Sequence, residues 1–152
     1  MKRIIFLVLV LLAAIYAAWP YAYLHRIDSA LTRNDQMTLA KLIDIDAVRA
    51  AAEHAMTRDV DTALGIGTDG FIGWLRTQVN ELGHAAVEEI IDMEWVTETL
   101  KPGPESFRSH ITHTSFESWS DFLIRHGELG DNPVHVRLKL TTGNWKVVAI
   151  YP

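Results

Sequence analysis

The sequence contains no cysteine, and this absence excludes several classes of site at once. Without a thiol, the chain has no disulfide framework, no thiolate zinc site, no cysteine nucleophile and no lipid-bearing cysteine of a lipoprotein. The absence leaves the compartment open, because exported domains are often but not always disulfide-bonded. The 152 residues suffice for one domain with its own hydrophobic core and a short appendage.

Basic charge is also scarce. Nineteen Asp and Glu residues outnumber fourteen Lys and Arg, so the formal net charge is −5. Two of the basic residues, Lys2 and Arg3, precede an apolar segment, and the remainder is therefore more acidic still. Proteins that bind nucleic acids depend on basic side chains that meet the phosphates. The sequence shows no basic stripe, and we exclude nucleic acid as a partner.

The N-terminus carries a long run without charge, from Ile4 to Trp19. A membrane-spanning helix needs about 20 apolar residues, whereas the apolar part of a signal peptide has roughly 7–15. The run is intermediate in length, but residues 20–24 extend it with Pro, Tyr, Ala, Tyr and Leu. Trp19, Tyr21 and Tyr23 fit the aromatic belt that marks a membrane–water interface. The segment is therefore predicted to be a membrane anchor, with a cleaved signal peptide as the alternative.

The residues near a potential cleavage site favour the uncleaved anchor. Signal peptidases prefer small residues at the cut and two places before it. In this sequence the residue two places before each alanine is large: Leu12 before Ala14, Ile15 before Ala17 and Tyr16 before Ala18. We therefore divide the chain into an anchor, residues 1–24, and a soluble domain, residues 25–152. With Lys2 and Arg3 inside, the positive-inside rule predicts a single-pass inner-membrane protein whose C-terminal domain lies in the periplasm.

The soluble part reads as helices followed by strands. Pro20 is suited to the first turn of a short helix, on which Leu24, Ile27 and Leu31 share one face. Further short helices are expected up to Leu100, before prolines at 102 and 104 end the helical pattern. The apolar period then changes to two, which predicts strands at 120–126, 134–141 and 145–150, with a fourth at 108–114. This order indicates an α+β fold: an N-terminal membrane helix, several short helices and a C-terminal antiparallel sheet of three to four strands.

Several short patterns follow one another in a familiar order. They are Pro20-Tyr21, Ala30-Leu31, Asn34-Asp35, residues 42–49 (LIDIDAVR), residues 116–119 (FESW) and residues 145–150 (WKVVAI). On these patterns the chain resembles a bacterial domain-of-unknown-function family of short, membrane-anchored envelope proteins. It is more loosely similar to the cone-shaped α+β superfamily named for a nuclear transport factor. That superfamily includes ligand binders, enzymes and partner-binding proteins, so the similarity implies a fold and no function.

Three motifs suggest chemistry but have simpler explanations. Gly65, Gly67 and Gly70 match a dinucleotide-binding pattern, yet the flanking segments lack its strand and parallel sheet, so we expect a loop between helices. The histidine pairs 110/113 and 126/135 have no carboxylates at ligand spacing, and we expect them to be exposed on the sheet. The acidic residues Glu88, Glu89, Asp92 and Glu94 are interpreted as a solvated helix face with Asp92 as a cap. No catalytic residue, metal site or cofactor is predicted.

The tryptophans are the remaining candidates for a site. Such side chains are most often part of the core, but some can line a cavity for an apolar ligand. The candidates for a cavity between helices and sheet are Trp74, Trp95, Trp119 and Trp145.

Three functions stay open at this point. The first is a non-enzymatic envelope module that binds a protein partner, and the second is a binder of a small apolar ligand between helices and sheet. The third is an enzyme of the cone-shaped fold that uses an Asp–His pair. An exposed edge of the terminal sheet could also support a homodimer.

Overall fold

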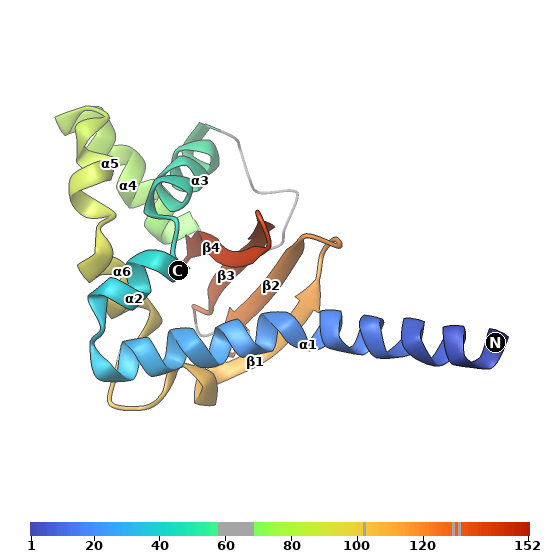
Figure 1. Ribbon diagram of the computed structural model, residues 1–152. Helices are drawn as coiled ribbons and strands as arrows, with labels where there is room; N and C mark the ends of the chain where they lie inside the picture. The colour runs from blue at the N-terminus through green and yellow to red at the C-terminus, as the bar shows by residue number, and fades with distance from the viewer. Residues whose placement is uncertain (58–68, 102, 129, 131) are drawn as a thin grey trace.

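The computed structural model describes residues 1–57, 69–101, 103–128, 130 and 132–152. Its longest element is helix α1, which runs from Lys2 to Arg33. The N-terminal half of α1 projects away from the body of the molecule, and its C-terminal half lies against the sheet (Figure 1). Among the described residues, α1 is the one helix that is long and apolar enough to cross a membrane.

Pro20 lies inside α1 and does not begin a new helix, so the prediction of a separate short helix is wrong. A proline has no N–H to donate, which leaves the carbonyl of Tyr16 without its usual helical partner. Burial compensates for this loss, because Pro20, Leu24, Ile27 and Leu31 all pack in the core. The predicted boundary after residue 24 therefore falls within a continuous helix.

Helix α1 ends where the sequence predicts. Asn34 adopts the left-handed conformation, with φ of 53°, and its N–H faces the carbonyls of Ala30 and Leu31. Asp35 then caps α2, because its carboxylate accepts a hydrogen bond from the N–H of Thr38 at 3.0 Å. The predicted break at Asn34-Asp35 is confirmed.

The middle of the chain forms short helices. They are α2 (Gln36–Leu42), α3 (Ile45–Thr57), α4 (Asp69–Leu82), α5 (Ala85–Ile90) and α6 (Met93–Leu100). The carboxylate of Asp44 accepts from the N–H of Ala47 at 3.1 Å at the start of α3. The guanidinium of Arg49 donates to the carbonyls of Ile91 at 2.9 Å and Glu88 at 3.0 Å, which joins α3 to the end of α5.

The C-terminal part is a four-stranded antiparallel sheet, in the order β1-β2-β3-β4. A short 3₁₀ helix, η2 (Phe107–His110), leads into β1 (Ile111–Phe116), which is followed by β2 (Asp121–His126), β3 (Val134–Thr141) and β4 (Asn144–Tyr151). The tight turn between β3 and β4 holds Thr142 and Gly143, both with positive φ, as a two-residue hairpin requires. The predicted α+β fold is confirmed, with four strands.

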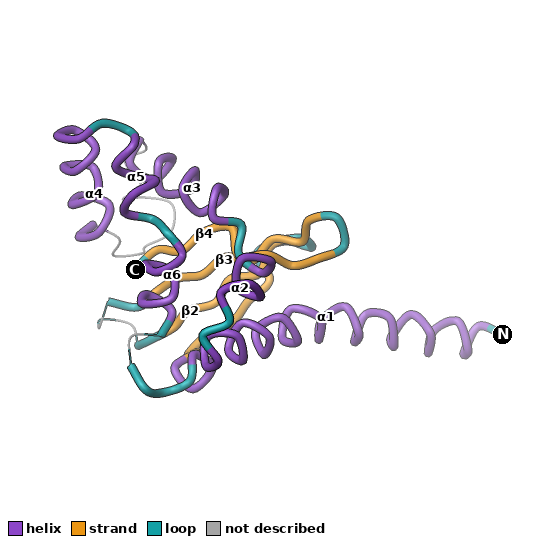
Figure 2. Tube along the Cα trace, turned by 60° about the vertical axis from the view of Figure 1, so that its left-hand side comes forward, coloured by secondary structure: helices purple, strands orange, loops and turns teal. Residues whose placement is uncertain are grey.

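Helices α1, α2 and α3 pack against this sheet. Figure 1 shows α1 beside β1, and Figure 2 shows α3 near β4. A parallel bridge joins Ile43 to Val147 of β4, and the N–H of Asp44 donates to the carbonyl of Val147 at 2.9 Å. The core is filled by large side chains that are fully buried, among them Trp145, Phe122 and Ile27.

We expect truncation of a side chain in the C-terminal half of α1 to destabilise the domain, and truncation in the N-terminal half to leave its stability almost unchanged. Ile27→Ala empties a buried site and should lower the free energy of unfolding by about 2–5 kcal/mol. Leu9→Ala removes a side chain that projects beyond the domain and should change it by less than about 0.5 kcal/mol. Denaturant unfolding of the full chain in mild detergent, followed by circular dichroism, measures both. Equal losses would show that the two halves of the helix are not distinguished by packing.

Candidate functional site

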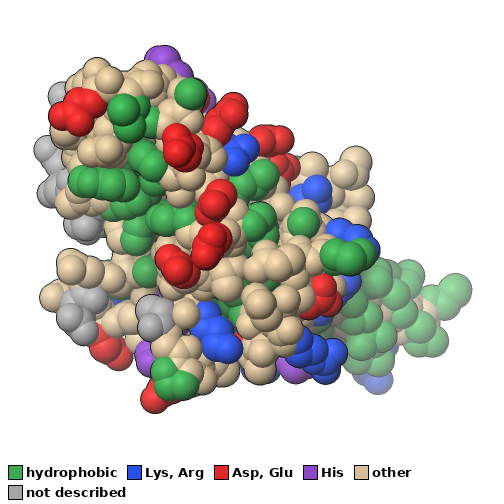
Figure 3. Space-filling model, turned by 90° about the vertical axis from the view of Figure 1, so that its left-hand side faces the viewer, with side chains coloured by type: hydrophobic (Ala, Val, Ile, Leu, Met, Phe, Trp, Pro, Cys, Tyr) green, Lys and Arg blue, Asp and Glu red, His purple; other side chains and the backbone are tan. Residues whose placement is uncertain are grey.

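The most extensive apolar surface lies on the projecting half of α1. Ten large side chains there are about half exposed or more: Ile4, Ile5, Phe6, Leu7, Val8, Leu9, Val10, Leu11, Leu12 and Ile15. Figure 3 shows the projecting helix covered almost entirely by hydrophobic side chains. Water-soluble monomers rarely expose a continuous apolar surface of this kind, so it marks a site of contact with lipid or protein. The predicted anchor residues Lys2, Arg3 and Ile4 lie at its free end.

A row of tyrosines marks where α1 meets the sheet. The ring of Tyr16 stacks on Phe116 with 6.0 Å between ring centroids. The hydroxyl of Tyr21 lies 3.0 Å from that of Thr114, and Tyr23 donates to the side-chain oxygen of Asn144 at 2.7 Å.

The predicted aromatic belt is therefore only partly available to lipid. Trp19 and Tyr21 are exposed, whereas Tyr23 is buried in the domain. The hydrogen bond of the Tyr23 hydroxyl accounts for its place inside, because a buried hydroxyl needs a partner.

The four tryptophans proposed for a ligand cavity are not brought together. Trp145 is fully buried in β4, and Trp95 stacks on Phe71 at 5.3 Å between centroids. Trp74 on α4 is 48% exposed, and Trp119 in the turn between β1 and β2 is 76% exposed. The indole nitrogen of Trp145 has no hydrogen-bond partner among the described residues. A cavity lined by these residues stays a prediction.

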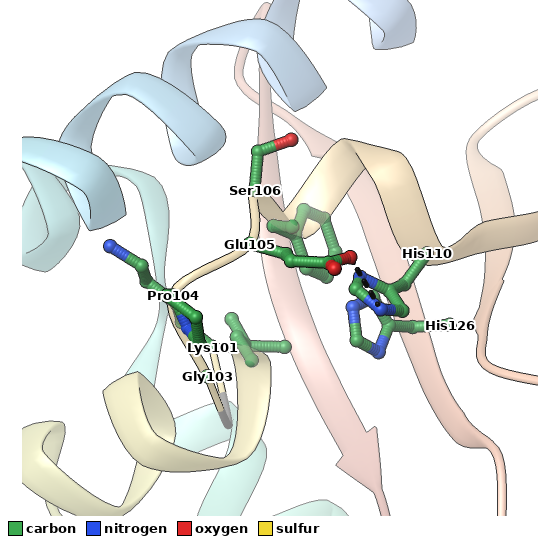
Figure 4. A pocket seen from close by; sticks show the side chains of 9 residues that line it. Lys101, Gly103, Pro104, Glu105, Ser106, His110 and His126 are labelled. Atoms are coloured by element: carbon green, nitrogen blue, oxygen red, sulfur yellow. Dashed lines mark ion pairs between the residues drawn. The ribbon is translucent and has the colours of Figure 1, made fainter.

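A surface pocket of about 280 Å³ lies between the end of α6 and the start of the sheet. Five of the residues that line it are Lys101, Glu105, Phe107, His110 and His126. Figure 4 shows Glu105 and His110 directed toward each other, with His126 beside them. The carboxylate of Glu105 lies 3.1 Å from Nε2 of His110.

His126 is the buried member of this group. Its ring stacks almost parallel on Phe107, with 5.0 Å between centroids, and its centroid lies 5.3 Å from that of His110. Burial, assisted by the neighbouring His110, lowers the pKa of His126 below its ordinary value, so the ring is neutral near pH 7. The pocket thus combines an exposed Glu–His pair with a neutral imidazole.

The expectation that these histidines are exposed is wrong for two of them, because His126 and His135 are both buried. His126 shares the buried face of β2 with Ile124 and Phe122, which lie two and four residues earlier, and the alternation in the sequence already contained this signal. His135 lies opposite Arg125 and Tyr151, and these large side chains account for its burial. The histidines do not pair with each other, because His126 lies opposite Val134.

The remaining sequence motifs give no site. Gly65 and Gly67 lie outside the described residues, and Gly70 is in the first turn of α4. Asp92 caps α6 as predicted, with the N–H of Trp95 donating to its carboxylate at 2.7 Å. Within the described ranges, no group of three or more His, Asp or Glu residues is arranged to hold a metal ion.

Comparison with known proteins gives one match. Residues 9–99 match the family described as "Protein of unknown function (DUF2939)". No curated protein and no solved structure matches the chain. The match confirms the resemblance to a family of unknown function, and it covers most of the apolar segment, helices α2 to α5 and nearly all of α6. The looser similarity to the cone-shaped superfamily stays a prediction.

The buried histidines predict that acid destabilises the fold. Burial lowers the pKa of His126 and also that of His135, where the positive charge of Arg125 adds to the effect. As the pH falls through the unfolded-state value of 6.5, the unfolded chain therefore binds protons that the folded chain does not, and stability is lost. The thermal midpoint, followed by tryptophan fluorescence, should fall between about pH 7.5 and about pH 5.5.

His126→Leu should weaken this dependence on pH, because it removes one of the two groups. His113→Gln is the matched control, since His113 is exposed on β1 and should leave the slope unchanged. If the two substitutions changed the slope of the thermal midpoint against pH equally, the loss of stability in acid could not be assigned to the buried histidine.

Proposed function

The chain belongs to the DUF2939 family of proteins of unknown function, and we propose that it is a single-pass membrane protein with a non-enzymatic interaction domain outside the cytoplasm. The observation that carries this proposal is the division of α1. One half exposes apolar side chains along its length, and the other half packs inside the domain. A helix of this kind ties the domain to a bilayer without a flexible linker.

The ends of the apolar segment support the orientation. Lys2 and Arg3 precede the segment, and the next basic residue is Arg26, whose guanidinium carbon lies 5.3 Å from the centre of the Tyr23 ring. The two charges at the N-terminus favour the cytoplasmic side, so the C-terminal domain lies on the opposite side, in the periplasm of a cell with an inner membrane.

An interaction domain is favoured over an enzyme by the chemistry of the described residues. The carboxylates that face histidines are Glu105 beside His110 and Glu53 beside His84. Both carboxylates are well exposed, whereas acid–base catalysis usually relies on groups whose pKa values burial or a close charge has shifted. The Asp–His pair of the enzyme alternative is not among these contacts.

A homodimer through the sheet edges has less support than contact with another protein. The edge of β4 already bonds to residues 43 and 44, and β1 lies along α1 (Figure 1). Both edges are thus partly covered, which is how native sheets avoid edge-to-edge pairing. Trp74 and Leu82 instead expose apolar surface on α4, at the end of the domain remote from the N-terminus (Figure 1).

The placement is tested by fusing a reporter after Pro152. A phosphatase that is active only outside the cytoplasm should be active, and a fluorescent protein that folds only in the cytoplasm should be dark. The fusion should stay with the membranes after an alkaline wash, because the apolar helix is embedded. Release of the domain into the soluble fraction would indicate a cleaved signal, and a fluorescent cytoplasmic fusion would refute the orientation.

The interaction role is tested by a photoreactive amino acid at position 74 in living cells. A partner that docks on α4 should give a discrete adduct with a second envelope protein, since tryptophans are enriched where proteins bind. The matched control is the same amino acid at Met37, which is exposed and lies just after α1. No adduct from position 74, or an identical pattern from position 37, would argue against a specific partner there.

A further inference from the structure

The part of α1 that does not touch the domain is shorter than the hydrocarbon layer of a bilayer is thick. Among the residues that the structure describes, Tyr16 is the first in α1 that packs against the core. The stretch from Lys2 to Ile15 rises roughly 21 Å at about 1.5 Å per residue. The hydrocarbon layer of a bilayer is about 30 Å thick. If the charges of Lys2 and Arg3 lie at one boundary of this layer, the helix reaches the other boundary near residues 21–23.

The residues just before that boundary already contact the domain. Tyr16 stacks on Phe116, and Pro20 is buried. The part of the domain beside Tyr16 must then lie at the level of the lipid, or the bilayer must thin locally by several ångströms.

The contacts along α1 identify this part of the domain. The N–H of Arg108 points to the carboxylate of Asp28, at 3.3 Å, near the C-terminal end of the helix. Further along the strand, Thr114 contacts Tyr21 and Phe116 contacts Tyr16. β1 thus runs antiparallel to α1, and the turn after Phe116 faces the N-terminal half of the helix, as Figure 1 shows.

We propose that the turn between β1 and β2, residues 116–120, inserts Phe116 and Trp119 into the interface of the bilayer that α1 spans. This inference rests on the proposed membrane anchor and adds a second contact between the domain and lipid. Trp119 is 76% exposed and Phe116 is 40% exposed. Tryptophan is the side chain most typical of the membrane–water interface, because its ring is apolar and its N–H is polar.

The two carboxylates at the turn have partners within the domain. Glu117 forms an ion pair with Arg137 at 2.9 Å. The carboxylate of Asp121 accepts hydrogen bonds from the hydroxyls of Ser118 at 2.6 Å and Ser120 at 3.0 Å. A carboxylate with such partners loses less solvation when the turn approaches lipid than a free one.

Lipid is the occupant that these observations favour over a protein. The turn lies beside the apolar half of α1, so the two surfaces face the same layer. A second protein at this position would have to share the membrane interface with the helix.

The absence of cysteine makes a direct test available, because a single introduced cysteine can be labelled without background. The full chain carries an environment-sensitive fluorophore at Trp119→Cys, Met37→Cys or Leu9→Cys. It is reconstituted in vesicles of phosphatidylethanolamine and phosphatidylglycerol that contain a lipid with a quencher near the headgroup or deep in the acyl chain. Met37 is the matched control, because it is 75% exposed and lies in α2, just after the C-terminal end of α1.

The label at 119 should be quenched several times more strongly by the headgroup quencher than the label at 37. The label at 9 should be quenched by the deep quencher, which reports the anchor itself. A second outcome is that the label at position 9 is quenched while the label at position 119 is quenched no more than the label at position 37. The turn then stays in water, and this inference is wrong, although the proposed anchor holds. If 9 is not quenched, the proposed anchor fails as well.

A second measurement keeps the native turn. Lipids with brominated chains quench tryptophan fluorescence in the unlabelled protein, and Trp119→Phe should reduce the quenched share. Trp74→Phe is the control, because Trp74 lies on α4 away from the anchor. This substitution removes a tryptophan that the lipid does not quench, so the quenched fraction of the total fluorescence should rise. Equal effects of the two substitutions would overturn the inference.

Discussion

The structure depends on the continuity of α1 across Pro20. A break at this proline would leave an apolar segment and a domain joined by a flexible hinge, and the two would move independently. The helix instead continues, because the side chains on both sides of the proline are held by the domain: Tyr16 by Phe116, and Leu24 by the core. The missing hydrogen bond costs free energy that the burial of apolar surface offsets. The position of the apolar segment relative to the domain follows from this one helix.

The domain is built around the inner half of the same helix. The residues that match the family end at 99, before the sheet, yet the sheet supplies Phe122 and Trp145 to the common core. Residues 44–49 connect the two parts. Asp44 caps α3 and bonds to β4, while Arg49 binds two carbonyls at the end of α5. This motif therefore has a structural role, because its polar atoms satisfy backbone groups that would otherwise be unpaired.

The histidines show how a polar group is accommodated in this fold. His126 is neutral and stacks on Phe107, so that it behaves as an aromatic side chain of the core. Its neighbour His110 remains at the surface with Glu105. The carboxylate of Glu105 is well exposed to solvent, whereas the ring of His126 is shielded from it.

The sequence by itself determined most of the helices and strands, although not the continuity of α1 across Pro20. The spacing of Leu24, Ile27 and Leu31 predicted a buried helix face, and the alternation around Phe122 and Ile124 predicted a strand, because local periodicity decides which side of an element is apolar. The tertiary structure alone decided which apolar sides meet. It buried Pro20 within one helix, separated the four tryptophans and placed Phe116 against Tyr16, one hundred residues away. These contacts depend on packing between segments that are distant in the sequence, and the pattern within one segment does not predict them.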